Sequence, residues 1–456
     1  MSKATDITLK EISTCTRSYA YRQPIKFGGR VVDSVTVLRC EITVTSGQGK
    51  KKTVGIGEMT MGNAWAWPSK IPAPLTLKIL IDLAERIVEH ARTLNLSGDP
   101  LQITHRLAHE RKALVAEFEK ERNLQEPIPK LAVMLAASPL EAAIHDAFGR
   151  SLDRNSFDCM TSEFLNQDLG AYLGEEFIGQ YPDKVLSAKP KPTMPLYHLV
   201  GALDPLTDDD VRQKLNDGFP QTLEQWLSTD GLTHLKIKLA GNDLDWDVGR
   251  IVEVNRVAEL IAQDRKWRYS LDFNEQCPNE DYVLDLIERV ERLSRPALDR
   301  VQYIEQPTPR DLTQRTDMTV HRIARLRPIV IDESLVDLES LRLARQRGYT
   351  GIALKACKGQ TECLLMAAAG VHHQMFVCVQ DLTCIGGSFL HSAAIASRLP
   401  AVVAIEGNGR QYCPAGNEAY MAGYAPMFRV RYGTIPTQLL DGIGLGFEWQ
   451  PLGSDN

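Results

Sequence analysis

Charged side chains stand at the ends of consecutive apolar runs in the second half of the chain. The carboxylates and amines in question are Lys236, Lys238, Asp272, Glu305, Asp332 and Lys355. Carboxylates that lie close together raise each other's pKa, and a divalent cation removes their repulsion. All-oxygen ligands with an incomplete shell suit Mg²⁺. Amines flank these carboxylates on both sides. Together the residues predict an enzyme that removes the proton next to a substrate carboxylate. The metal would stabilise the resulting enolate, and an amine of lowered pKa would take the proton.

Each of these residues also has a plainer interpretation. Lys236 and Lys238 alternate with apolar residues in 234–239, which is the period of a β-strand and would suit an exposed strand face equally well. Each carboxylate could cap a helix at a turn after a strand. Burying a lysine inside a sheet costs free energy unless its charge is paired with an acid or used for catalysis or binding. The charged residues on the strands that follow therefore favour the functional interpretation.

A repeated strand-and-helix pattern must position these residues. From residue 195 onward eight short apolar runs recur, mostly with a helical stretch between them: 196–200, 235–239, 268–273, 301–304, 329–331, 351–354, 376–379 and 402–405. Eight such units predict an α/β fold, a closed TIM-type (β/α) barrel, whose active site lies at the C-terminal ends of the strands. An open doubly wound sheet is the alternative, but no Gly-x-Gly-x-x-Gly follows the first strand.

The first third of the chain has a different pattern. Residues 7–60 alternate in the manner of an antiparallel meander, with a polar loop expected at 19–30. Residues 74–149 are helical in pattern, and Pro139 is expected in the first turn of a helix. Trp65 and Trp67 could serve packing or form an apolar wall for a ligand. His372 and His373 end a helical stretch, where they would complement the helix dipole rather than bind metal.

Composition narrows the class of protein. The net charge of −6 and the lack of basic tracts argue against a nucleic-acid partner. The nine cysteines form no Cys-x-x-Cys pair, which is typical of reduced thiols and predicts a cytoplasmic protein. The N-terminal residues lack the apolar core of a signal peptide, and no uninterrupted apolar run has the length of a membrane span, so we expect no membrane partner.

The order of short motifs resembles a known family. Lys-x-Lys, Asp-x-Asn, Glu-Gln-Pro, Asp-Glu-Ser and Leu-Lys follow one another on successive strands within about residues 230–360. This order is similar to the enolase superfamily and, within it, to the muconate lactonizing enzyme subgroup of the mandelate racemase/muconate lactonizing enzyme family. The resemblance implies that Asp272, Glu305 and Asp332 bind Mg²⁺, with Mn²⁺ as a possible substitute.

The resemblance also assigns roles to the lysines and to the rest of the chain. It implies that Lys238 and Lys355 are an acid/base pair on opposite faces of the substrate, and that Lys236 lowers the pKa of Lys238. It implies an α+β capping domain with specificity loops around 19–30 and 57–67. The expected domains are a cap at 1–149, an irregular connection at 150–194, a barrel at 195–409 and a tail at 410–456 that returns to the cap.

Four further strand-end residues, Asn274, Glu333, Asp381 and Glu406, are expected to bind substrate or support the metal ligands. The eighth strand end, residues 405–408, lacks the Asp-x-Asp that dipeptide epimerases use to hold an amino group, which disfavours a dipeptide substrate. No His-Asp dyad follows the sixth and seventh strands, so lysine is the expected base.

The predicted function is Mg²⁺-dependent abstraction of a proton α to a carboxylate. A racemase or epimerase of a small carboxylic acid comes first. A cycloisomerase, an enzyme like o-succinylbenzoate synthase and an acid-sugar dehydratase are the alternatives. A catalytically inactive barrel with a binding role is the non-enzyme alternative. We further expect a homo-oligomer.

Overall fold

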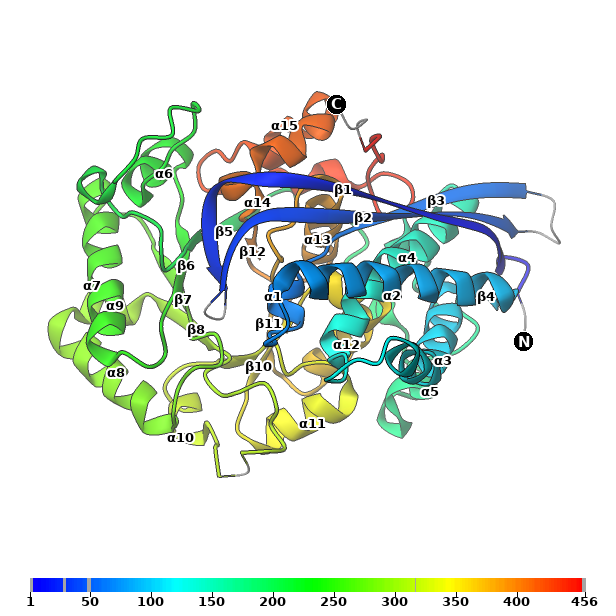
Figure 1. Ribbon diagram of the computed structural model, residues 1–456, viewed down its shortest axis with the longest axis horizontal. Coiled ribbons are helices and arrows are strands. Elements are labelled where there is room, and N and C mark those ends of the chain that lie inside the picture. Colours follow the sequence, from blue (N-terminus) through cyan, green and yellow to red (C-terminus); the bar gives the residue numbers. More distant parts are fainter. Residues whose placement is uncertain (1–2, 28–29, 47–50, 316, 453–456) are drawn as a thin grey trace.

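An antiparallel sheet forms the N-terminal part of the molecule. The structure is a computed structural model that describes residues 3–27, 30–46, 51–315 and 317–452. The sheet has the strand order β3-β2-β1-β4. Its strands are β1 (Ile7–Phe27), β2 (Arg30–Ser46), β3 (Lys51–Thr60) and β4 (Ser97–Gly98), and the first two are long ribbons that cross the top of the molecule (Figure 1).

Four helices accompany this sheet: α1 (Asn63–Ala66), α2 (Ala73–Thr93), α3 (Pro100–Glu121) and α4 (Lys130–Ser151). Helix α4 packs on β3, where two glycines permit close approach. A Cβ at Gly57 would lie 2.1 Å from the carbonyl oxygen of Pro139, and one at Gly55 would lie 2.4 Å from that of Ala143. Among the described residues α4 is the one helix long and apolar enough to cross a membrane, but 94% of its apolar window is buried, so it is a core helix here.

Two sequence-based expectations about this region are wrong. Residues 19–27 continue β1 and Arg30 begins β2, so the expected loop at 19–30 is the end of a hairpin, and residues 28–29 lie outside the described ranges. Contacts with the barrel explain the ordered strands, because Ile25 packs with Leu199 and Tyr412. Pro139 lies inside α4 rather than in its first turn, since the helix begins nine residues earlier, at Lys130.

Strands β5 to β12 close into a parallel barrel. The bounds are β5 (Met194–Val200), β6 (His234–Lys238), β7 (Arg268–Asp272), β8 (Val301–Glu305), β9 (Ile329–Ile331), β10 (Gly351–Leu354), β11 (Phe376–Val379) and β12 (Ile405–Glu406). Each strand pairs with the next along the chain, and pairing of β12 with β5 completes the ring. The predicted closed (β/α) barrel with an N-terminal cap is confirmed.

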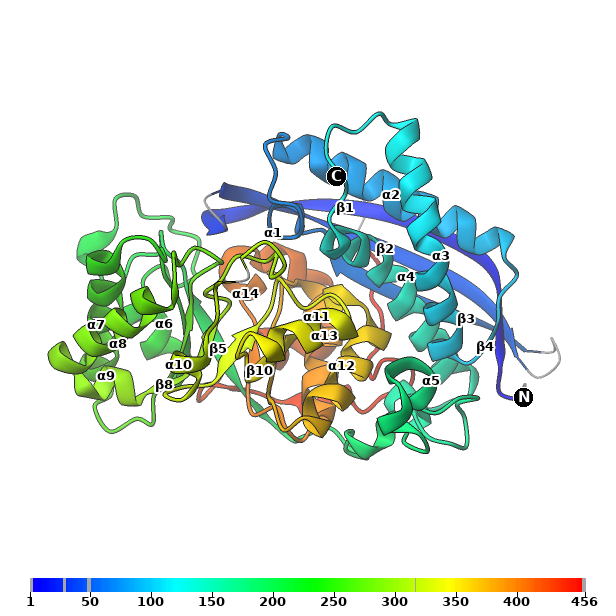
Figure 2. The ribbon, with the colours of Figure 1, turned by 90° about the horizontal axis from the view of Figure 1, so that it is seen from below.

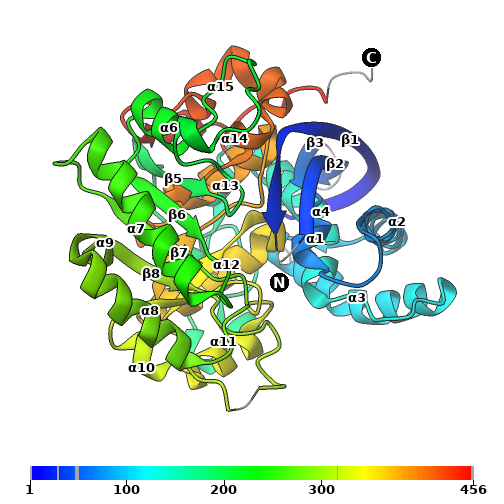
Figure 3. The same cartoon turned by 60° about the vertical axis from the view of Figure 1, so that its left-hand side comes forward.

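Helices between the strands cover the outside of the barrel (Figure 3). They are α6 (Leu223–Asp230), α7 (Leu244–Ile261), α8 (Glu280–Leu293), α9 (Arg295–Asp299), α10 (His321–Ala324), α11 (Leu338–Gln346), α12 (Gln360–His372) and α13 (Gly386–Arg398). The eighth unit departs from the expected pattern. Its strand β12 is short and starts three residues later than the apolar run suggested, and only the four-residue α14 (Gly409–Tyr412) follows it.

Short helices fill the connection between cap and barrel: η1 (Ser156–Cys159), α5 (Gly170–Leu173), η2 (Glu175–Phe177) and η3 (Pro182–Lys184). A further 3₁₀ turn, η4 (Asp208–Asp210), follows β5, and η5 (Ala356–Lys358) follows β10. The tail contains η6 (Pro414–Tyr420), α15 (Met421–Phe428), β13 (Thr434–Ile435) and η7 (Thr437–Leu440).

The tail touches both parts of the molecule. Strand β13 pairs antiparallel with the start of β5. Farther on, the Leu445 amide donates to Asp146 of α4 at 2.9 Å, and Arg150 of the same helix pairs with Glu448 at 3.2 Å. Figure 2 shows the cap sheet and helices α2 and α3 lying along one side of the barrel, so that the cap covers part of its rim.

Candidate active site at the barrel rim

The predicted carboxylates and lysines meet at the C-terminal rim of the barrel. Lys238, Asp272 and Glu305 are the last residues of β6, β7 and β8, and they are paired side by side across the sheet. Asp332 follows β9 directly, and Lys355 follows β10. All five side chains are buried. Successive parallel strands end at the same edge, which is why residues far apart in sequence converge here.

Lys236 lies at the centre of this cluster. Its Nζ is 2.9 Å from Glu305 Oε1, 2.9 Å from Glu406 Oε2 and 3.1 Å from Asp272 Oδ2. Burial lowers the pKa of this amine, but the surrounding carboxylates, Glu305 first, outweigh burial and raise the pKa well above its ordinary value. Lys236 is therefore held as a cation that contacts three acids and offsets part of their negative charge.

The two outer lysines each face one carboxylate. Lys238 Nζ lies 2.5 Å from Asp272 Oδ2, and Lys355 Nζ lies 2.8 Å from Asp332 Oδ2. Burial lowers the pKa of Lys355, yet Asp332 outweighs it and the net shift is upward. In the protein on its own, Lys355 is therefore held as an ammonium ion, because Asp332 stabilises the charged form; the expected lowering of its pKa, which includes the charge of a bound cation, stays a prediction.

The carboxylates respond to their surroundings in opposite directions. Burial disfavours the charged form of Asp272, but Lys238 and Lys236 reverse this effect and bring its pKa below the usual range. The pKa of Glu305 is raised to about 8 by burial and then by the neighbouring charge of Asp272. Burial and the charge of Asp272 thus favour the protonated form of Glu305 in the protein on its own.

This group of buried carboxylate oxygens fits a hard divalent cation. Neither Asp332 carboxylate oxygen has a well-aligned hydrogen bond, although both lie within ion-pair distance of lysines. Lysine ammonium groups stand between the three acids. Among the described residues, only Glu176, His372 and His373 have three ligand atoms that all lie within 4.8 Å of one another. Asp272, Glu305 and Asp332 would therefore have to turn from the lysines to share one ion.

Trp65 of the cap covers the site at the C-terminal rim of the barrel. Its Nε1 donates a hydrogen bond to Glu333 Oε1 at 3.1 Å, and Lys355 Nζ lies 4.5 Å from the centre of its indole ring. Arg310, which is paired with Glu275, donates to the Trp65 carbonyl at 3.1 Å. Within the expected segment 57–67, residues 57–60 belong to β3 and Trp65 reaches the rim. Of the two tryptophans, Trp65 forms a wall of the site.

Trp67 lies in the cap core, where its Nε1 donates to Glu126 at 2.7 Å. A cavity of about 50 Å³ beside Trp65 is lined by Tyr21 and Leu382 among others. That volume is too small for an organic acid.

The four supporting residues have distinct environments. Glu333 has a pKa raised well above its ordinary value by burial and then by Asp332, and its Oε2 has no hydrogen-bond partner within the described ranges. Asn274 donates its backbone amide to Asp272 Oδ1 at 2.9 Å and has a φ of 46°, which indicates a turn residue that holds Asp272.

Asp381 accepts the backbone amides of Cys384 and Asn408, each at 3.2 Å. Burial and then Glu406 raise its pKa to about 8. Glu406 itself is engaged by Lys236 and by Asn408 Nδ2 at 3.2 Å. Both acids therefore have internal partners at the eighth strand end.

Sequence reasoning missed three residues that orient the acids. Lys358 lies 3.1 Å from Asp332 Oδ1. Gln306 Oε1 accepts the Asp332 backbone amide at 2.9 Å, and Gln380 Nε2 donates to Glu305 Oε2 at 2.5 Å. Gln306 stands within the Glu-Gln-Pro motif, and Gln380 follows β11, so strand-end position was a signal for both. Lys358 lies in η5, beyond any strand end.

The sequence model of the family described as Enolase C-terminal domain-like matches residues 219–452, about half of the 456-residue chain. The protein belongs to the enolase superfamily. Known members are isomerases, epimerases, cycloisomerases and lyases, so this superfamily member is an enzyme. A search of curated proteins gave no match.

Solved structures share the fold of this superfamily enzyme at low identity. The L-Ala-D/L-Glu epimerase from Bacillus subtilis is 17% identical with a TM-score of 0.65, over 97% of this chain and 99% of that one. The muconate lactonizing enzyme from Pseudomonas fluorescens is 16% identical with a TM-score of 0.60, over 97% and 96%. An enolase from Bradyrhizobium, complexed with magnesium and mandelic acid, is 17% identical with a TM-score of 0.61, over 98% and 97%.

Proposed function

We propose that this enzyme uses Mg²⁺, or Mn²⁺ in its place, to abstract the proton α to the carboxylate of a small organic acid, and that it is a racemase or epimerase. Asp272, Glu305 and Asp332 would hold the ion. Their oxygen donors, their burial and the repulsion between Glu305 and Asp272, which a cation would relieve, support that assignment. When bound, the cation would stabilise the negative charge on the substrate's enolate oxygens and take over from the lysines the neutralisation of these acids.

The observation that carries the proposal is the placement of the two outer lysines. Lys238 ends β6 and Lys355 follows β10, and these strands lie four positions apart in the closed ring. A substrate held between them presents opposite faces of its α-carbon to the two amines. One lysine can then remove the α-proton while the other delivers a proton to the opposite face, which inverts the centre.

The remaining residues orient these groups and exclude water. Trp65 covers Lys355 and keeps solvent from the reacting carbon, which strengthens the electrostatic interactions inside the site. Lys236 stays a cation between Glu305 and Glu406, so it is a positioning residue rather than a base. Because Glu406 is engaged by Lys236, it is poorly placed to hold a substrate ammonium group, which supports an acid other than a dipeptide.

The experiment that tests the proposal is a screen of small carboxylic acids for exchange of the α-proton with deuterium from solvent, in the presence of Mg²⁺. With a substrate in hand, Lys238→Ala and Lys355→Ala should each abolish racemisation. Each variant should still catalyse α-proton exchange for one enantiomer, and the two variants should favour opposite enantiomers. Turnover of both enantiomers by Lys355→Ala would overturn the two-base mechanism and favour a one-base cycloisomerase or dehydratase.

Loss of all exchange, together with a melting temperature that Mg²⁺ does not change, would favour the non-enzymatic binding role. The homo-oligomeric state, the cytoplasmic location, and the absence of nucleic-acid and membrane partners stay predictions. Size-exclusion chromatography with light scattering tests the first of them directly.

A further inference from the structure

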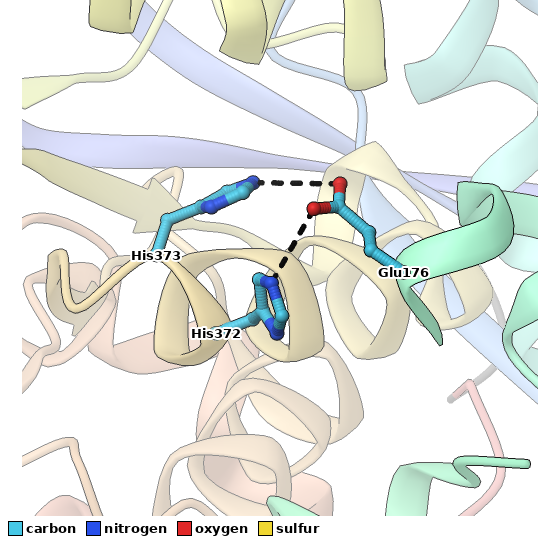
Figure 4. Close-up of side chains that lie close together, drawn as sticks. All are labelled: Glu176, His372 and His373. Atoms are coloured by element: carbon cyan, nitrogen blue, oxygen red, sulfur yellow. Dashed lines mark ion pairs between the residues drawn. The ribbon is translucent and has the colours of Figure 1, made fainter. Parts of the chain in front are cut away.

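A second group of potential metal ligands lies on the outer surface of the molecule. Glu176 belongs to η2 in the connection between cap and barrel, and His372 and His373 stand at the C-terminal end of α12. Both imidazoles turn their Nε2 atoms toward the Glu176 carboxylate (Figure 4). The side chain of His372 is 36% exposed and that of Glu176 is 43% exposed, so an ion can reach them from solvent.

The distances in this group suit an ion better than a direct contact. His372 Nε2 lies 3.4 Å from Glu176 Oε2, and His373 Nε2 lies 4.0 Å from Oε1. A hydrogen bond between such atoms is about 2.7–3.2 Å long. Two ligand atoms bound about 2.0–2.2 Å from a tetrahedral ion are about 3.3–3.6 Å apart. All three ligand atoms lie within 4.8 Å of one another, so small side-chain rotations bring them around one ion.

Residues around Glu176, His372 and His373 restrict their side chains, and both positive and negative charges lie nearby. The rings of Phe177 and His372 are 4.7 Å apart, which limits rotation of that imidazole. The C-terminal end of α12 carries the negative end of the helix dipole, which favours a cation. Arg345 and Arg342 contribute positive charge near His373. Their positive charge opposes a cation, and the Glu176 carboxylate offsets it.

We propose that Glu176, His372 and His373 form a binding site for a divalent transition-metal ion of the Zn²⁺ class, separate from the rim carboxylates. Two imidazoles and one carboxylate match the ligand preference of Zn²⁺ and Cu²⁺ and not that of Mg²⁺. Water completes the shell. The ion ties the connection segment to α12, the helix that follows Lys355 and η5. The sequence alone favours complementation of the helix dipole at His372 and His373, and the proposal assigns them metal binding instead.

Isothermal titration of the full-length enzyme with Zn²⁺, prepared without a histidine tag and kept in excess Mg²⁺ to occupy the rim carboxylates, tests the site. We expect one Zn²⁺ per chain at this site. His372→Ala, His373→Ala and Glu176→Gln should each weaken binding about tenfold or more, since even outer partners of metal ligands contribute 10- to 100-fold. Zn²⁺ should also raise the melting temperature of the wild type and not of the double variant His372→Ala/His373→Ala.

His90→Ala is the matched control. His90 Nε2 lies 2.9 Å from Glu110 Oε2, and no third ligand atom of the described residues lies within 4.8 Å of both, so this pair offers a histidine and a carboxylate without a complete ligand set. The control should bind Zn²⁺ as the wild type does. Absence of Zn²⁺ binding, or equal affinity in the wild type and the double variant, would overturn the proposal.

Cu²⁺ gives an independent spectroscopic readout. The electron paramagnetic resonance spectrum of the Cu²⁺-loaded enzyme should show hyperfine coupling to two imidazole nitrogens, and His372→Ala should leave one. Coupling to a single nitrogen in the wild type would contradict the site. Either result leaves the proposed rim chemistry untouched, because the α-proton exchange depends on other residues.

Discussion

Two layers of side chains inside the barrel differ in chemistry although they lie only two residues apart on the same strands. The lower layer is an apolar cluster of Tyr197, Tyr303, Val330, Ala353, Cys378 and Ala404. Two residues later on five of these strands come Glu305, Asp332, Lys355, Gln380 and Glu406, which are polar or charged and equally buried. The strand period of two directs both sets into the barrel, so position along the strand alone separates them.

Lys236 connects the two layers. In the sheet it is paired with Ser270, which is paired in turn with Tyr303 of the lower layer. Its long side chain nevertheless reaches Glu305 and Glu406 in the upper layer. Buried charges are costly unless they are paired, and this lysine supplies the pairing. The difference between the layers implies that substitutions in the upper layer impair chemistry, whereas those in the lower layer impair folding.

The largest effect is expected at Asp272. Asp272→Asn keeps the shape of the side chain but removes a charged oxygen ligand. We expect α-proton exchange to fall by about 10³-fold or more, because a metal contributes several kcal/mol of charge stabilisation, while the far-ultraviolet circular dichroism spectrum stays that of a folded protein. Asp299→Asn on α9 is the control and should keep full activity. Exchange within tenfold of the wild type would remove Asp272 from the site.

In the lower layer, Tyr303→Ala should destabilise the fold. The side chain is buried and its ring packs 6.0 Å from that of Tyr197. Loss of a buried aromatic ring costs about 3–5 kcal/mol in free energy of unfolding, which urea denaturation would measure. Tyr303→Phe, which keeps the ring, should cost much less. If Tyr303→Ala unfolded at the wild-type urea concentration, the lower layer would not be the stabilising one.

A smaller effect is expected at Gln380, whose amide donates to Glu305 Oε2. Gln380→Met keeps similar bulk and removes the hydrogen bond. Mg²⁺ affinity should fall about 10- to 100-fold, as is typical when the partner of a metal ligand is lost, with little change in stability. Titration calorimetry with Mg²⁺ measures this, and Gln346→Met on the exposed face of α11 is the control. Unchanged affinity would mean that Lys236 alone orients Glu305.

Strand periodicity explains which parts of the fold could be predicted from the sequence. The runs at 329–331, 351–354 and 376–379 coincide with β9, β10 and β11, because short β-branched and apolar runs bounded by polar turns leave little choice. The last strand was misplaced by three residues. Val402 and Ala404 are buried without belonging to β12, so an apolar pattern there marks packing rather than pairing.

The candidate site was predictable where it depended on strand ends and unpredictable where it depended on distant contacts. Asp272, Glu305 and Asp332 could be placed at one rim because parallel strands end together. The hydrogen bond from Trp65 to Glu333 joins residues that are 268 positions apart in the sequence. The ion pair of Lys236 with Glu406 joins β6 to β12 past the intervening β5. No local pattern encodes either contact, since the first arises only after cap and barrel have packed and the second only after the ring of strands has closed.

The smallest expected effect compares acids that have a cationic partner with one that has none in the described part of the chain. Glu362 lies on α12, outside the barrel interior, where it is half-buried and has no ion pair within 4.0 Å among the described residues. Its pKa is raised to about 7, first by burial and then by the neighbouring charge of Glu141. The folded state therefore binds this proton more tightly than the unfolded state, and the group disfavours folding progressively as the pH rises from the ordinary glutamate pKa toward 7.

Glu362→Gln removes that titration and should raise the melting temperature above pH 7. Below about pH 4.5 glutamate is protonated in both the folded and the unfolded state. The variant and the wild type should therefore have the same melting temperature there. Differential scanning calorimetry between pH 4 and pH 8 measures the difference, and Glu117→Gln on the exposed face of α3 is the matched control. Asp272 at the rim should respond in the opposite way, since Lys238 and Lys236 hold its pKa below the ordinary value and Asp272→Asn therefore loses stability at neutral pH. If Glu362→Gln also lost stability at neutral pH, Glu362 would have a cationic partner in solution, and the contrast between paired acids at the rim and an unpaired acid behind it would fail.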